Sequence, residues 1–191
     1  NETKKEFDKK PVLERFDHQL KISGLKTFHT LKPDFSWGCS NIDKLISKYN
    51  LSDYILLFPF CSEHLQQKKW PYYDQLIKLI KQNHPNLKIV IAPGPDEIEK
   101  AKKLDAISIL KEDKAISISE LAGLIKKSKF VVANDTGPAH MAAHLNVKGL
   151  SLFGSHTTAH KVSIERENFK AIQVSDLKNL SAEKVFERLV L

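Results

Sequence analysis

Short apolar runs, each followed by a stretch with helical periodicity, recur along most of this sequence and constrain its fold more than any other feature. The runs are mostly apolar and too short for buried helices. We expect them to form six strands, at residues 54–58, 87–92, 107–110, 130–133, 150–153 and 171–174. Strands that are apolar on both faces are typical of a parallel sheet covered by helices on both sides. The sequence therefore predicts an α/β, Rossmann-like fold.

Local capping signals indicate helices between these strands. Pro71 and Pro138 are typical of a first helical turn, which needs no amide donor. Ser117 and Glu120 have the spacing of a capping box, and Ser181 is placed to cap a last helix. Each predicted strand is thus separated from the next by a polar or helical connection, as a parallel sheet requires.

The first 50 residues lack this alternation. Residues 1–11 are charged and show no periodicity, so we expect a frayed lead. Apolar positions at helical spacing indicate a helix over 12–24, and Asn41 can cap a short second one. We interpret residues 1–50 as a linker with helices, and residues 51–191 as the folded domain.

Composition limits the classes of function. The chain has 191 residues, 41% of them hydrophobic, which suffices for one core. Cys39 and Cys61 are too few for a disulfide framework, and no signal peptide or long apolar stretch is present, so we expect a cytoplasmic protein. The net charge of +7 could serve a nucleic acid, an anionic membrane or a phosphorylated ligand. Most lysines alternate with acidic residues on predicted helix faces, however, so we expect no nucleic-acid partner.

The richest candidate site follows the predicted strand 130–133. In parallel sheets ligands bind beyond the carboxyl ends of the strands. Here the chain reads Asn-Asp-Thr-Gly-Pro-Ala-His over 134–140, which predicts a helix start whose first amides, near Gly137 and Ala139, face a phosphate. Thr136 adds a hydroxyl and His140 lies in the first turn. Because a carboxylate repels phosphate, Asp135 favours a ligand that also carries a sugar.

Two other interpretations of this segment remain open. Asp135 can be an N-cap, with Thr136 and Gly137 forming only a tight turn. His140 and His144 have the i, i+4 spacing of metal ligands, but no third ligand and no Glu between them support zinc, so we expect no metal.

Two further loops carry polar side chains to the same edge. After the first strand, Ser62 and the Lys68-Lys69-Trp70-Pro71 segment bring a hydroxyl and an ammonium that suit phosphate, although the lysines can equally be solvated; Trp70 is expected to anchor the core. After the second strand, Asp96 and Glu97 can accept hydrogen bonds from ribose, and for Asp96 we prefer a helix cap. No glycine fingerprint for a dinucleotide or ATP occurs.

Taken together, these motifs resemble the signature of glycosyltransferase family 9, the ADP-heptose-dependent lipopolysaccharide heptosyltransferases. The resemblance rests on 134–140 with Ala142 and Ala143, on Leu152-Phe153-Gly154, and on 68–71, and it covers about residues 54–190. Such enzymes have two GT-B domains, of which the C-terminal, Rossmann-like half binds the nucleotide sugar. This chain resembles only that half. The resemblance then implies that the acceptor site and the general base lie in a missing N-terminal half, so that this chain binds donor without turnover.

Matching positions imply specific roles. Lys68 and the backbone at Thr136 and Gly137 would hold the diphosphate, with Ser62 beside them. Asp135 would contact the sugar, His140 the sugar or phosphate, Glu97 the ribose, and Ile116 the adenine. The implied reaction is inverting transfer of heptose to a lipid-linked saccharide, without a metal or cofactor. We expect a monomer in at most transient contact with the inner face of the inner membrane.

Two departures from the family pattern leave the sugar open. A stretch at 155–161, Ser-His-Thr-Thr-Ala-His-Lys, replaces the usual proline-containing turn, and the loop between Ser62 and Lys68 is long. A transferase of another nucleotide sugar therefore remains an alternative. So does a non-catalytic nucleotide-binding module on the same scaffold, because a fold does not fix a function.

Overall fold

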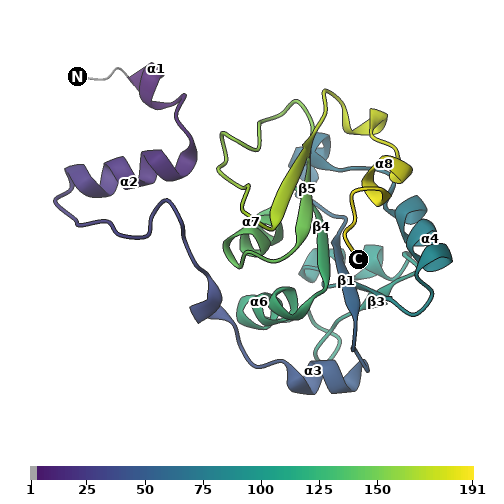
Figure 1. The fold of residues 1–191 in the computed structure, drawn as a ribbon. Coiled ribbons are helices and arrows are strands. Elements are labelled where there is room, and N and C mark those ends of the chain that lie inside the picture. Colours follow the sequence, from purple (N-terminus) through teal and green to yellow (C-terminus); the bar gives the residue numbers. More distant parts are fainter. Residues whose placement is uncertain (1–3) are drawn as a thin grey trace.

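A six-stranded parallel sheet forms the centre of the molecule (Figure 1), seen in a computed structural model that describes residues 4–191. The strand order is β3-β2-β1-β4-β5-β6. All six predicted strands are confirmed, with ends shifted by a few residues: β1 Tyr54–Phe58, β2 Lys88–Ile91, β3 Ile107–Ser108, β4 Phe130–Asn134, β5 Gly149–Phe153 and β6 Phe169–Gln173. The predicted Rossmann-like class is confirmed.

Helices cover both faces of the sheet, as the mostly apolar strands predicted. Alternate residues of a strand point to opposite faces, so Leu56 and Phe58 of β1 pack in one core cluster and Ile55 and Leu57 in the other. The first cluster lies under α3 Asp43–Lys48, α6 Ile118–Lys127 and α7 Gly137–His144; the second lies under α4 Tyr73–Asn83, α5 Ile98–Ala101 and α8 Ala182–Phe186. Short 3-10 helices complete the connections: Ser36–Gly38, Glu63–Lys68, Pro95–Glu97 and Leu177–Asn179.

The helix caps follow the sequence signals in part. The Ser117 hydroxyl accepts a hydrogen bond from the Glu120 amide at 3.2 Å, and the Glu120 carboxylate accepts one from the Ser117 amide at 2.9 Å, which confirms the capping box. Ser181 caps α8 by accepting from the Lys184 amide at 3.3 Å. Pro138 is the second residue of α7 rather than the first.

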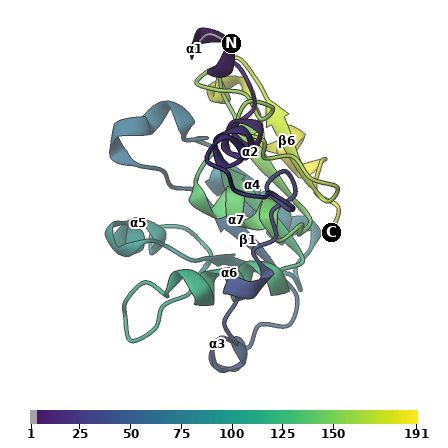
Figure 2. The same ribbon diagram turned by 90° about the vertical axis from the view of Figure 1, so that its left-hand side faces the viewer.

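The N-terminal segment differs in packing from the rest of the described chain. Residues 4–41 contribute no buried residue. Their helices, α1 Lys4–Phe7 and α2 Val12–Ile22, lie to one side of the sheet domain in Figure 1, so that α2 overlaps the domain in the turned view of Figure 2. The α1 turn corrects the expectation of a frayed lead, of which residues 1–3 lie outside the described range. Burial begins with Ile42 and Leu45 at α3, which pack in the core although they precede residue 51. Among residues 4–191, no helix has the length and apolar character needed to cross a membrane.

The strand order creates a crevice at one point of the sheet. From β1 the chain moves outward to β2 and β3, and then returns to the other side of β1 with β4. The loops that leave β1 and β4 therefore run to opposite faces, which opens a crevice beyond the carboxyl ends of these two strands. The motifs that follow Phe58 and Asn134 both begin at this crevice.

Candidate functional site

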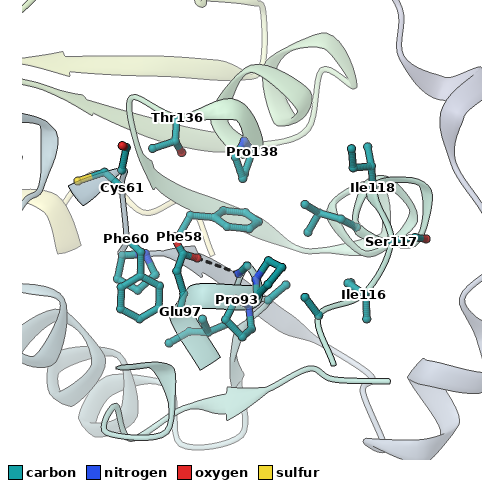
Figure 3. A pocket seen from close by; sticks show the side chains of 18 residues that line it. Phe58, Phe60, Cys61, Pro93, Glu97, Ile116, Ser117, Ile118, Thr136 and Pro138 are labelled. Atoms are coloured by element: carbon teal, nitrogen blue, oxygen red, sulfur yellow. Dashed lines mark hydrogen bonds between the residues drawn. The ribbon is translucent and has the colours of Figure 1, made fainter. Parts of the chain in front are cut away.

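A cavity of about 510 Å³ occupies this crevice (Figure 3). Its size falls in the range of small-molecule sites. The walls come from the loops after β1, β2 and β4 and from the start of α6. In Figure 3, Thr136 and Pro138 form one side, while Phe60 and Cys61 lie across from Ile116 and Ile118. The lining is mostly apolar with a few polar groups.

Four of the eight residues singled out from the sequence line this cavity, namely Ser62, Glu97, Ile116 and Thr136. Ser62 precedes the 3-10 helix Glu63–Lys68, and its side chain does not cap that helix. The Thr136 hydroxyl donates to the Asn134 carbonyl oxygen at 3.3 Å. Apolar wall residues such as Phe60, Pro93 and Ile118 carried no distinguishing sequence signal.

Glu97 has a structural task as well as a place in the cavity. Its Oε2 accepts a hydrogen bond from the Gly94 amide at 2.8 Å, the contact drawn in Figure 3, and so closes the turn Pro95–Glu97. The expectation that Asp96 caps the helix is wrong, because the Gly94–Glu97 pair takes that role. A carboxylate can accept several hydrogen bonds, so Glu97 can accept another one at the cavity wall.

Three more of the predicted residues meet beside the cavity, around the carboxylate of Asp135. This side chain is only 3% exposed. Lys68 Nζ lies 2.7 Å from its Oδ2, and His140 Nε2 lies 3.5 Å from its Oδ1. Lys68 is thus paired, which corrects the alternative that it is merely solvated. Asp135 is not the N-cap of α7 either: Thr136 occupies that position.

The electrostatics keep Asp135 ionised. Burial by itself would raise the pKa of this carboxyl group, but hydrogen bonds from His140, Lys68 and His156 and the charge of Lys68 outweigh it. The net result is a pKa held well below the usual range of an aspartate. The cluster therefore presents a fixed negative charge whose neighbours are cationic or hydrogen-bond donors.

Asn134 explains how Lys68 reaches this place. The Asn134 side chain is fully buried, and its Oδ1 accepts a hydrogen bond from the Trp70 amide at 3.1 Å. Trp70 is itself fully buried and donates through its indole nitrogen to the Leu180 carbonyl at 2.7 Å, which confirms its predicted anchor role. With the backbone fixed at Trp70, Lys68 two residues earlier extends towards Asp135.

The start of α7 is open where a ligand would approach. A side chain at Gly137 would meet nothing within 4 Å among the described residues. The Ala139 amide, by contrast, donates to the Thr136 carbonyl at 3.0 Å. Of the two amide positions expected to face a phosphate, Ala139 is therefore already occupied, because the first turn of α7 closes on itself.

His156 is a member of the Asp135 cluster that the sequence motifs did not single out. Its Nε2 lies 3.1 Å from Asp135 Oδ2. The signal was its position: it follows β5 by three residues, and the ends of β4 and β5 are neighbours in the sheet. His144 lies outside this cluster, with its Nδ1 3.3 Å from Arg166 Nη2, and no metal-binding group of three His, Cys, Asp or Glu occurs in residues 4–191.

Comparison with known proteins identifies the family. The sequence model of glycosyltransferase family 9 (heptosyltransferase) matches residues 5–189. The chain belongs to glycosyltransferase family 9. The family assignment agrees with the motifs at 68–71 and 134–140, so the resemblance noted from sequence is confirmed.

One curated sequence and several solved structures resemble this chain. Lipopolysaccharide heptosyltransferase 1 of Campylobacter coli is 29% identical over 114 residues, which cover 55% of this chain and 33% of that protein. The structure of the E. coli heptosyltransferase WaaC with ADP is 22% identical, with a TM-score of 0.67 over 91% of this chain and 54% of that one. The UDP-GlcNAc 2-epimerase of Methanocaldococcus jannaschii is 18% identical, with a TM-score of 0.53 over 93% of this chain and 52% of that one. The family 9 chain thus spans a third to about half of these proteins and has the fold of GT-B glycosyltransferases.

Proposed function

We propose that this chain is the donor-binding half of a heptosyltransferase, which binds ADP-heptose for inverting transfer of the sugar to the lipopolysaccharide core. The observation that carries the proposal is the Asp135 cluster next to the crevice cavity. It combines a cation for a diphosphate with a fixed anion for sugar hydroxyls. Family membership and the structural likeness to a heptosyltransferase with ADP support it.

The geometry suggests how a nucleotide sugar would lie. The apolar wall at Ile116 would take the base, and Glu97 Oε1 would accept from the ribose. The diphosphate would then reach Lys68 and the open start of α7 at Gly137, with the Thr136 and Ser62 hydroxyls beside it. Asp135 and His140 would meet the sugar. This order follows the line from the apolar to the charged end of the crevice.

In the transfer step, the departing ADP gains negative charge, and Lys68 would stabilise it. Stabilisation of developing charge by a fixed cation is worth a few kcal/mol in a site shielded from water, on the order of 3 kcal/mol per group. Asp135 is unsuited to act as the base, because its low pKa makes it a weak proton acceptor. By the family resemblance, the base for the acceptor hydroxyl would come from an acceptor-binding half.

The acceptor would be a lipid-linked saccharide, so we propose a cytoplasmic protein in at most transient contact with the inner face of the inner membrane. We propose a monomer that needs neither metal nor cofactor. The likeness to a UDP-GlcNAc 2-epimerase suggests which other donor to test: a uridine nucleotide sugar could bind to the same fold.

Calorimetric titration of the chain with ADP, ADP-heptose, UDP and NAD tests the proposal. We expect the chain to bind ADP and ADP-heptose, and to bind UDP and NAD only weakly. Asp135→Asn should weaken ADP-heptose by about tenfold or more, since a hydrogen bond to a charged group is worth about 1.5–3 kcal/mol, and should leave ADP largely unchanged. Preference for UDP would establish the alternative donor, and a folded chain that binds no nucleotide would contradict the proposal.

A further inference from the structure

Two donors share one oxygen of the buried Asp135 carboxylate. Oδ2 lies 2.7 Å from Lys68 Nζ and 3.1 Å from His156 Nε2, while Oδ1 has the longer, 3.5 Å contact to His140. An ionised carboxylate only accepts hydrogen bonds, so His156 Nε2 must carry a proton. Oδ2 therefore accepts one hydrogen bond from a flexible lysine and one from a ring, in addition to the longer contact of His140 at Oδ1.

The ring of His156 is held in place by its surroundings. Its side chain is 7% exposed and stacks on the fully buried Phe153, with ring centroids 6.0 Å apart and planes inclined by 12°. Gln173 fixes the loop by donating to the carbonyl oxygens of Gly154 at 2.6 Å and Thr157 at 3.2 Å. Among the described residues, the buried Nδ1 of His156 has no hydrogen-bond partner. The contact to Asp135 is thus the hydrogen bond that the ring makes.

Lys68 has the longest and most flexible side chain of the cluster. Its side chain is 23% exposed, against 3% for Asp135, and its ammonium group sits on a long flexible stem. A bound diphosphate would compete with Asp135 for this ammonium. Withdrawal of a partner from a buried charge is costly unless other donors remain. The structure supplies such a donor in the rigid ring of His156.

We propose that His156 is a positioning residue for donor binding: it keeps Asp135 hydrogen-bonded and in place while Lys68 turns from this carboxylate to the diphosphate. The inference rests on the proposed function, because it requires a ligand with a diphosphate. If His156 has this positioning role, its effect on the affinity for a diphosphate depends on the charge of Asp135.

A double-mutant cycle tests this dependence. The affinity for ADP is measured by calorimetry for the parent, His156→Leu, Asp135→Asn and the double variant. We expect His156→Leu to weaken ADP binding about tenfold in the parent, as the loss of a hydrogen bond to a charged group predicts. In the Asp135→Asn background the same substitution should change the affinity by less than about twofold, because the neutral amide does not need the donor.

Two control variants separate positioning from packing. His156→Gln retains an N–H donor and should restore most of the ADP affinity that His156→Leu loses. His160→Leu changes an exposed histidine of the same loop and should bind ADP as the parent does. In addition, the ¹⁵N spectrum of the parent should show His156 protonated at Nε2, and thermal unfolding should show that each variant is folded.

The outcomes are distinct. If ADP binds and His156→Leu costs the same affinity in both backgrounds, or if Nε2 is unprotonated, the positioning role is overturned while the proposed function stands. If neither the parent nor any variant binds ADP, the proposed function is wrong, and the inference, which rests on it, is wrong too. The role is established if His156→Leu lowers the ADP affinity only when Asp135 is present, and if His156→Gln retains most of that affinity.

Discussion

Around Asp135, charged and polar side chains from three segments meet at defined distances, whereas at the Ile116 end of the same crevice the wall is mostly apolar. The charged end depends on partners: each buried group needs a specific neighbour, or its burial is costly. The apolar end depends on shape and area. The two ends should therefore respond to substitution in different ways, and ligands that reach only one end can separate them.

The largest expected effect is at the charged end. Lys68→Ala should weaken ADP binding by about 10- to 100-fold, because the diphosphate loses a charge-assisted hydrogen bond. Lys69→Ala is the matched control. It removes the same charge from the next residue, whereas the ion pair with Asp135 is made by Lys68. Calorimetry should show less than about threefold loss for Lys69→Ala. If both variants lose the same ADP affinity, only the net charge matters, and the charged end of the crevice has no specific role.

At the apolar end, Ile116→Ala should weaken ADP by about fivefold to tenfold, the value expected for the loss of one branched apolar contact. Inorganic pyrophosphate supplies the control, because it lacks the adenosine and should bind Ile116→Ala as it binds the parent. Competition between the two ligands, followed by calorimetry, measures both affinities. Parallel losses for ADP and pyrophosphate would show that Ile116 supports the fold rather than the base.

The two ends should also differ in their response to pH. Because the folded-state pKa of Asp135 is lowered, its contribution to stability is present above the unfolded-state value of about 4 and is lost as pH falls further. The gap in urea midpoint between parent and Asp135→Asn should therefore narrow from pH 6 to pH 3. The gap between parent and Ile116→Ala should stay constant over that range. A gap for Asp135→Asn that widens towards acid would contradict the sign of the pKa shift.

The smallest effect should come from Ser62, which lines the cavity and is exposed. Ser62→Ala should lower ADP affinity by about two- to threefold, since a neutral hydroxyl on an exposed residue contributes little. Calorimetry on this variant, with Ser155→Ala as a control from another exposed loop position, would measure it. A loss comparable to that of Lys68→Ala would assign Ser62 to the charged end.

Much of the site was predictable because it follows from strand order and local motifs. The carboxyl ends of parallel strands share one edge, so Lys68, Glu97 and Asp135 could be expected there from sequence alone. The contacts that each side chain makes were harder to predict. Both Asp96 and Asp135 look like helix caps, yet neither is one, because Glu97 closes its own turn and the N-cap of α7 is Thr136.

By itself, the sequence determined the six-stranded α/β architecture and the placement of polar motifs at strand ends, because periodicity and capping are local properties that the chain carries in its own order. Only the tertiary structure decided that His156 joins Lys68 and His140 on the Asp135 carboxylate. That meeting joins residues from loops after β1, β4 and β5, and it depends on Asn134 and Trp70 fixing one loop and Gln173 fixing another. Contacts between distant segments are set by packing and by the need to satisfy a buried charge, and neither leaves a periodic trace in the sequence.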